Sequence, residues 1–219
     1  SLFFILERKR FTNYYAHLDM CKKYLFISER DNFLKEGYVL PNSSELVANL
    51  YDPMCRNLLF IGNMSSYPNI QAVENFISLN EDGLLKRGYR LYVLGGGNWT
   101  SDSILVTRIY EYDTLVGLGI HFSLALAPML SGAGLQNKVL DYVAHGLPCL
   151  MTQRVSESFP NFPGGFFIED DIANYSSIIT PSNVSDFDTV RRYIDVNFSC
   201  ESLLKTFLSV LDCILPESR

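Results

Sequence analysis

From residue 57 onward, short apolar runs recur along this chain, and segments long enough to form a helix separate them. Short continuous apolar runs are typical of strands that are buried on both faces, as in a parallel sheet. The intervening segments then supply helices that cover the sheet. The runs predict strands at residues 58–61, 90–94, 104–110, 123–127, 148–151 and 165–168. The sequence therefore predicts an α/β fold, a Rossmann-like, doubly wound parallel sheet with helices on both faces.

The segments outside these strands divide the chain into two parts. Helices are predicted at residues 70–79, 184–196 and 199–215. Before residue 57 the pattern is less regular. Residues 2–21 have apolar residues at roughly helical spacing, and residues 23–28 are predicted to form a strand. Residues 29–34 are predicted to form a short helix, and residues 37–53 a connector. We therefore expect residues 1–52 to form one part and residues 53–219 to form the α/β domain.

Composition restricts the classes of partner. Hydrophobic residues make up 47% of the 219 residues and charged residues 19%, which is the balance of a globular protein rather than a disordered one. The net charge is −6 and no Lys/Arg stripe is present, so nucleic acid is not an expected partner. The longest apolar stretch, residues 115–130, contains His121 and Pro128 and is too interrupted to span a bilayer.

The cysteines and the sequons bear on the cellular compartment. Five widely spread cysteines form no CxxC pair and no Cys/His cluster with metal-ligand spacing, so we expect free thiols, no metal site and a reducing, cytoplasmic location. Six Asn-x-Ser/Thr sequons are present, and those at Asn63 and Asn98 fall in loops expected to face a ligand. Because glycans there would obstruct the site, we interpret the sequons as accidental.

The most informative segment runs from Pro128 to Pro148. A strand ends, a turn of small residues follows at 131–134, a helix begins near Leu135, and Gly146 with Pro148 ends it. In open parallel sheets ligands bind beyond the carboxyl ends of the strands. A glycine turn that leads into a helix presents free backbone N–H groups and the positive end of the helix dipole. This segment therefore predicts an anion site that suits a diphosphate.

Other phosphate motifs are absent. Lys138 follows Gly134 by four residues with no hydroxyl residue after it, so the segment is not a Walker A loop. The three glycines at 95–97 follow a strand but do not continue as G-x-G-x-x-G. We interpret them as a tight turn at the end of a buried strand.

Two charged residues lie in the helix that follows the turn at 131–134. Lys138 is in the first turn, where its charge opposes the helix dipole and an anion would remove the conflict. Asp141 lies three residues later on nearly the same face, where a carboxylate can accept hydrogen bonds from ribose hydroxyls. Spacing alone equally allows a solvated surface pair worth a few tenths of a kcal/mol. The apolar residues on the other face of this helix are predicted to pack in the hydrophobic core: Leu135, Val139, Tyr142 and Val143.

Several segments match a known family in order. They are residues 57–64 (NLLFIGNM), 68–73 (PNIQAV), 90–97 (RLYVLGGG), 127–149 (APMLSGAGLQNKVLDYVAHGLPC) and 190–202. Together they resemble the C-terminal lobe of retaining GT-B glycosyltransferases of the group 1, or family 4, type. The resemblance covers most of residues 57–215, and its most specific part is the block at 132–148. It implies that residues 1–52 are a remnant of the N-terminal lobe with the interlobe connector.

The resemblance implies roles for the residues of the 132–148 block. Asp141 stands where the family usually has a ribose-binding Glu, and is one methylene shorter. Ala133 takes the place of a first Glu, so that backbone groups of the turn would face the sugar or the diphosphate. Lys138 matches the lysine of the family block, and Gln136 replaces the usual Arg, which removes one positive charge. The backbone set that faces the donor is Gly132, Ala133, Gly134 and Leu135.

The resemblance also implies contacts from two other strands and a reaction. Gly62 and Asn63 would lie against the diphosphate from the opposite side, and the base would pack near Ile109 and Tyr110. The implied enzyme is a glycosyltransferase that moves a sugar from a nucleotide-diphosphate donor to an acceptor hydroxyl with retention, in polysaccharide or glycoconjugate synthesis. Lys138 is the catalytic candidate, because it would stabilise charge on the leaving diphosphate.

The resemblance further implies the partners. The acceptor would be a glycan or a lipid-linked glycan, no metal or other cofactor is required, and any peripheral membrane association would come through the missing lobe. Without that lobe the fragment is not expected to catalyse. Two other classes stay open: a non-catalytic Rossmann-like nucleotide-binding or assembly module, which Gln136 and Asp141 allow, and a nicotinamide-dependent oxidoreductase, against which the absent G-x-G-x-x-G argues.

Overall fold

A six-stranded parallel sheet lies at the centre of this computed structural model, which describes residues 25–26, 38–45, 47–132, 135–159, 161–162, 166–180 and 187–214. The strands, in the order in which they lie side by side, are β5 (Val106–Ile109), β4 (Arg90–Leu94), β3 (Asn57–Ile61), β6 (Leu124–Ala127), β7 (Cys149–Met151) and β8 (Phe167–Ile168). All six predicted strands are present, and all neighbouring pairs are parallel. The predicted fold class is therefore confirmed.

The strand order makes β3 and β6 the central pair. The chain runs outward from β3 through β4 to β5, returns to the centre at β6, and then runs outward the other way. Strands β3 and β6 pair only at Leu58↔Leu124 and Leu59↔Ala125, so their carboxyl ends separate. A reversal of strand order leaves a crevice at the carboxyl edge of an open sheet. This switch point is where a ligand site is expected.

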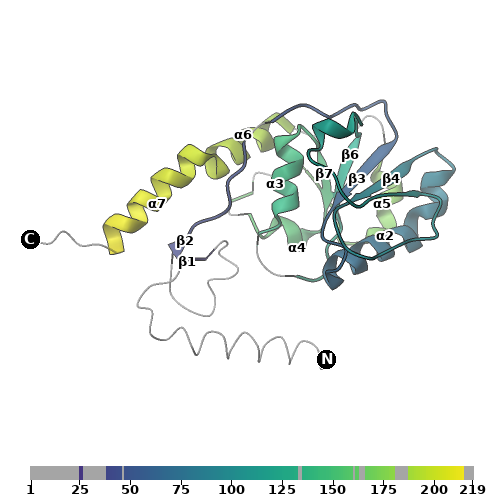
Figure 1. The fold of residues 1–219 in the computed structure, drawn as a ribbon, viewed down its shortest axis with the longest axis horizontal. Helices are drawn as coiled ribbons and strands as arrows, with labels where there is room; N and C mark the ends of the chain where they lie inside the picture. Colours follow the sequence, from purple (N-terminus) through teal and green to yellow (C-terminus); the bar gives the residue numbers. More distant parts are fainter. Residues whose placement is uncertain are drawn as a thin grey trace, which may run out of the picture.

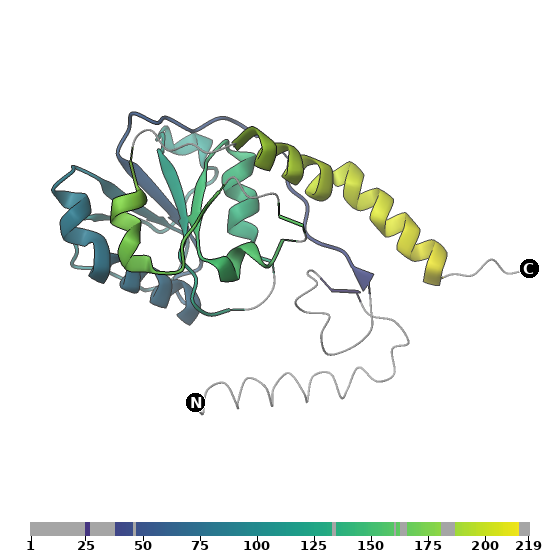
Figure 2. The same cartoon turned by 180° about the vertical axis from the view of Figure 1, so that it is seen from behind.

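Helices cover the sheet in two groups on opposite faces (Figures 1 and 2). On one face α2 (Tyr67–Leu85) contacts η3 (Ile172–Asn174) and α5 (Tyr175–Ile178), and on the other α3 (Asn137–Ala144) contacts α6 (Phe187–Phe198). The remaining helices are η2 (Val116–Leu118), α4 (Gln153–Ser156) and α7 (Cys200–Ile214), and α7 extends away from the sheet (Figure 1). Within the described ranges, every helix is too short or too polar to cross a lipid bilayer.

Local sequence explains the helices that begin beside β3 and β6. Helix α2 follows Ser66, has Pro68 near its start, and buries one stripe at helical spacing: Ala72, Val73, Phe76, Ile77, Asn80 and Leu84. Helix α3 has only eight residues, so packing rather than propensity must hold it. Its predicted core stripe is confirmed, since Leu135, Val139, Tyr142 and Val143 are all buried.

The segment before the sheet lies against this domain. Strand β1 (Leu25–Phe26) falls in the strand predicted at 23–28 and pairs in parallel with β2 (Tyr38–Val39), which the connector prediction missed. The backbone of the connector then follows α3, with Val47 N 2.8 Å from Ala144 O and Leu50 N 2.9 Å from His145 O. The helical segments predicted at 2–21 and 29–34 lie outside the described residues, and the boundary at residue 52 stays a prediction.

Candidate functional site

The loops that follow β3 and β4 fit together backbone to backbone. Gly62 N donates to Leu94 O at 2.9 Å, and Met64 N donates to Gly96 O at 2.7 Å. A Cβ atom on Gly95 would lie 2.4 Å from Gly62 O, and Gly95 has a φ of +120°, so both space and conformation require glycine. The glycines at 95–97 therefore form the predicted tight turn, which holds the loop after β3 in place.

Lys138 points inward from the first turn of α3 and is only 9% exposed. Its Nζ donates to Asn69 Oδ1 at 2.6 Å and lies 3.4 Å from Met129 Sδ. The same ammonium lies 4.2 Å from the centre of the Phe60 ring. The alternative of a solvated pair with Asp141 is wrong, because Lys138 is buried and its hydrogen bond goes to α2.

Among the described residues, the contacts of Lys138 are with neutral groups. Burial lowers the pKa of Lys138 to about 7, and the neighbouring Cys149 thiol opposes this only in part. Burial also raises the pKa of Cys149, so this thiol stays neutral at physiological pH. The partners are thus an amide, a thioether, a ring and a thiol. A buried ammonium with only neutral partners carries a desolvation cost that an anion would offset.

Tyr142 bridges the two strands that separate at the switch point. Its hydroxyl accepts a hydrogen bond from Ile61 N at 2.9 Å and donates one to Leu126 O at 3.0 Å. These backbone groups lie beyond the last residues at which β3 and β6 pair. The phenol therefore satisfies two backbone polar groups that lie beyond the ladder between β3 and β6.

Asp141 lies on the exposed side of α3, away from Lys138. Protein atoms that crowd one side of its carboxylate raise its pKa, and His145 opposes the shift. Tyr112 lies in the segment that returns from β5 to β6. Burial raises the pKa of the Tyr112 phenol, and the negative charge of Asp141 raises it further. No hydrogen bond or ion pair joins Asp141 to Lys138. The structure thus leaves Asp141 accessible without bringing the two charges together.

Ile109 and Tyr110 lie at the far end of the same edge. Ile109 is the last residue of β5, two strands away from β3, and Tyr110, which follows it, is 46% exposed. The Arg108 guanidinium lies 4.5 Å from the Tyr110 ring centre and donates to Val93 O at 2.8 Å and to Gly95 O. Two strand spacings are about 10 Å. Tyr110 and Lys138 could therefore contact only opposite ends of an extended ligand.

The glycine turn before α3 is described in part. Gly132 has a φ of +107°, lies against Pro68 and accepts a hydrogen bond from Arg154 Nη2 at 2.9 Å. Leu135 is buried, Gln136 is the half-buried residue that precedes α3, and neither caps the helix with a side chain. Ala133 and Gly134 lie outside the described residues, so the contacts expected of them stay predictions.

Three side chains that sequence reasoning did not assign to the site reach it. They are Asn69, which holds Lys138, Tyr142, which was expected only in the core, and Arg154, which brings a guanidinium to the turn where Gln136 replaces an Arg. Asn69 lies in the PNIQAV block at 68–73, so that block was the available signal. No sequence signal pointed to Arg154, because its contact with Gly132 depends on how α4 packs.

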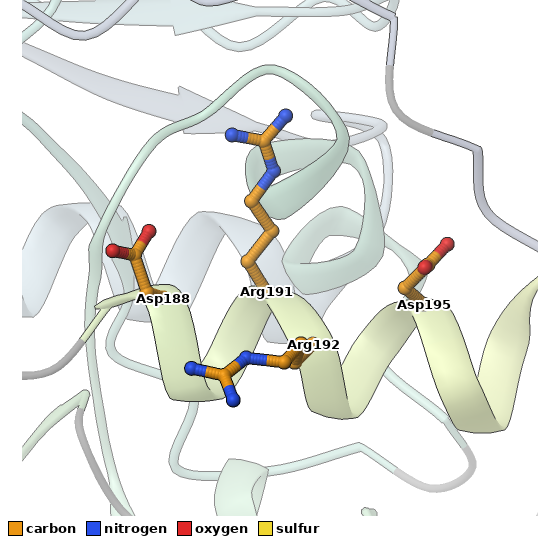
Figure 3. A pocket seen from close by; sticks show the side chains of 4 residues that line it. All are labelled: Asp188, Arg191, Arg192 and Asp195. Carbon is orange, nitrogen blue, oxygen red and sulfur yellow. The ribbon is translucent and has the colours of Figure 1, made fainter.

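A hollow of about 340 Å³ lies elsewhere, along α6 (Figure 3). Its four lining residues are exposed and come from this single helix: Asp188, Arg191, Arg192 and Asp195. Two acids and two bases spaced four residues apart cancel in charge and are typical of a solvated helix face. This hollow is therefore not part of the candidate site.

Comparisons with known proteins identify the fold. No family model matches the chain, and no curated protein matches it. Among solved structures, TarM is similar with a TM-score of 0.67 and 12% identity, over 85% of this chain and 42% of TarM. A glycosyltransferase from Rickettsia africae ESF-5 is similar with a TM-score of 0.64 and 14% identity, over 90% of this chain and 64% of that one.

A third similar structure is AviGT4, a glycosyltransferase involved in avilamycin A biosynthesis, with a TM-score of 0.58 and 13% identity over 89% of this chain and 64% of AviGT4. The chain thus spans less than two thirds of the length of each of these proteins. A mutant of S. aureus TarM with a similar fold was solved with fondaparinux, α-GlcNAc-glycerol and UDP. At these identities the likeness establishes a fold that glycosyltransferases share.

Proposed function

We propose that this chain is the donor-binding lobe of a retaining glycosyltransferase, and that it holds the diphosphate of a nucleotide-sugar at the switch point between β3 and β6. The observation that carries the proposal is Lys138, an ammonium buried at this point with only neutral partners among the residues that the structure describes. The shared fold of glycosyltransferases supports the proposal, as does the order of the sequence matches.

The two helices beside the switch point favour an anion. Neither α2 nor α3 has an acidic residue in its first turn, and neither has a side-chain cap at its start. The positive dipole ends of both helices are therefore not matched by an acidic side chain and stay available for phosphate oxygens. The diphosphate would lie between these helix starts, against Gly62 and Asn63 on one side and the turn at Gly132 on the other.

The rest of the donor would extend along the carboxyl edge. The ribose hydroxyls would donate to the exposed carboxylate of Asp141, and the base would pack near Ile109 and Tyr110. As the bond between the anomeric carbon and the diphosphate breaks, negative charge gathers on the diphosphate. Lys138 and the positive ends of the two helix dipoles, fixed before the reaction, would stabilise that charge. Groups that activate the acceptor hydroxyl would belong to the other lobe.

The remaining features of the proposal follow from the family resemblance. The donor is a nucleotide-diphosphate sugar, and the acceptor is a glycan or lipid-linked glycan in polysaccharide or glycoconjugate synthesis. The enzyme would work in the cytoplasm without a metal or other cofactor, with any peripheral membrane contact through an N-terminal lobe. The lobe alone would bind its donor and not catalyse.

Calorimetric titration of UDP, GDP, ADP and NAD into the chain tests the proposal. We expect one of the three nucleoside diphosphates to bind, and NAD to bind more weakly. A folded chain that binds none of the four would contradict the proposal. Tightest binding of NAD would instead favour an oxidoreductase.

A non-catalytic module is the second candidate, because Gln136 stands where the family pattern has an Arg. Binding of a nucleoside diphosphate without sugar transfer in the full-length protein would favour it. Transfer in the full-length protein that Lys138→Met abolishes would favour the enzyme.

A further inference from the structure

Asn69 lies between the two halves of the proposed diphosphate site. It occupies the first turn of α2, where its Nδ2 donates to Asn63 O at 2.9 Å and its Oδ1 accepts from Lys138 Nζ at 2.6 Å. Asn63 belongs to the loop after β3, and Lys138 to the first turn of α3. A single amide therefore joins the loop on one side of the switch point to the cation on the other.

The orientation of this amide is fixed by its partners. The carbonyl oxygen of Asn63 can only accept a hydrogen bond, and the Lys138 ammonium can only donate. The amide nitrogen must therefore face Asn63, and the amide oxygen must face Lys138, since a flipped amide would lose both hydrogen bonds.

Gly62 holds the amide from a third side. A Cβ atom built on Gly62 would lie 2.8 Å from Asn69 Cγ and 2.9 Å from its Nδ2. Gly62 is not among the glycines with a positive φ, so space rather than conformation requires glycine at this position. The Asn69 side chain fills the place that any side chain at residue 62 would need.

The other contacts of Lys138 do not fix the ammonium in the same way. The groups that face it are Asn69 from α2, Phe60 from β3, Met129 from the loop after β6 and Cys149 from β7. A thioether is a weak acceptor, a ring face is not directional, and burial keeps the Cys149 thiol neutral. Among the described contacts of Lys138, Asn69 Oδ1 is thus the one oxygen acceptor.

We propose that Asn69 is a positioning residue of the donor site, whose amide holds the Lys138 ammonium toward the backbone of Gly62 and Asn63. Lys138 and the loop after β3 would then contact the diphosphate together. This inference rests on the proposed function and adds a residue that acts through Lys138. It also implies that Asn69 favours the charged form of the lysine, because an amide oxygen accepts a stronger hydrogen bond from a charged ammonium than from a neutral amine.

Two substitutions of Asn69 show whether it positions the Lys138 ammonium or only links α2 to α3. Asn69→Ala removes the acceptor, so the Lys138 titration should move to lower pH, and inorganic pyrophosphate should bind about tenfold more weakly at pH 7.5. Asn69→Asp places a carboxylate beside the ammonium, so the titration should move to higher pH. Pyrophosphate affinity should nevertheless fall, because the carboxylate pairs with Lys138 and repels the phosphate oxygens. Asn75→Ala and Asn75→Asp, later in the same helix, are the matched controls.

The measurements are an NMR titration of the lysine side chains in the complete chain and calorimetry with inorganic pyrophosphate from pH 6 to pH 9. Opposite shifts of the Lys138 midpoint in the two Asn69 variants, with weaker pyrophosphate binding in both, would support the inference. If the wild-type chain binds pyrophosphate and both Asn69 variants keep its midpoint and affinity, the inference is overturned and the proposed function stands. If the wild-type chain binds neither pyrophosphate nor any nucleoside diphosphate, the proposed function fails and the inference with it.

Discussion

The two helices beside the switch point, α2 and α3, begin in a different way from α4, α6 and α7. Helices α6 and α7 have acidic residues in their first turns, Asp188 and Glu201. At α4, the backbone N–H of Gln153 donates to Asp170 Oδ1 at 2.8 Å. Helices α2 and α3 have no acidic residue in the first turn and no side-chain cap.

This difference shows where the chain leaves positive potential unmatched. An acid at a helix start typically contributes about 0.3–1 kcal/mol, so leaving it out at α2 and α3 forgoes stability. The same region also buries Lys138 among neutral groups. Both features cost stability in the empty protein, and a bound anion would relieve both.

The largest expected effect concerns Lys138 and the pH dependence of folding. The pKa of Lys138 is about 7 in the folded chain against 10.5 for an ordinary lysine. Between these values the unfolded chain holds a proton that the folded chain lacks, so the Lys138 contribution to stability rises with pH. The gain in unfolding free energy from pH 7 to pH 10 should be about 3 kcal/mol. Urea unfolding of wild type and Lys138→Met at both pH values measures it as the difference between the two chains.

Lys205 supplies the control for this measurement. It lies exposed on α7, with Nζ 2.7 Å from Glu201 Oε1. Lys205→Met should leave the pH dependence of the wild type unchanged. If Lys138→Met showed the same dependence as wild type, the burial of this charge would not distinguish the start of α3 from the other helices.

The next effect is on anion binding. Lys138→Met should weaken inorganic pyrophosphate and UDP about a hundredfold at pH 6.5, because it removes a buried charge-assisted contact. Uridine, which lacks phosphate, should be affected far less. Calorimetry with the three ligands measures the difference. Equal losses for UDP and uridine would assign Lys138 a structural role.

A smaller effect should follow when the start of α3 is made to resemble that of α4. Gln136→Asp places an acidic cap at the residue before α3. It should raise the unfolding free energy by about 1 kcal/mol. It should also weaken pyrophosphate binding about tenfold, because the carboxylate would repel the phosphate oxygens at the start of α3. Thermal unfolding of this variant tests the gain in stability, and calorimetry tests the loss of pyrophosphate affinity. Tighter pyrophosphate binding would contradict the view that the start of α3 is left without an acid for an anion.

The smallest effect is expected from the reciprocal change at α4. Asp170→Ala removes the acceptor of the Gln153 N–H and should cost roughly 0.5–1 kcal/mol of stability. Pyrophosphate affinity should not change, because this acid lies outside the proposed site. Urea unfolding measures the cost. A gain in pyrophosphate affinity would show instead that α4 also contributes to the anion site.

Much of the fold was predictable because its signals are local. The strand predicted at 90–94 is β4 itself, and each of the other five sheet strands differs from its prediction by at most two residues at either end. Residues that recur every three or four positions assign the buried face of α2 and α3 before any packing is known. The two-residue strand β2 was missed, since it carries no periodic signal.

The sequence by itself determined that a parallel sheet forms and that a glycine turn leads into a helix at its carboxyl edge, because burial on both faces and turn chemistry are properties of neighbouring residues. It left Lys138 equally able to lie on the surface or in a site. Only the tertiary structure decided this, by bringing Asn69 to within 2.6 Å of a lysine 69 residues away and by closing Phe60 and Met129 around it. Such contacts depend on the path of the chain through β3 and β6, which no local pattern encodes.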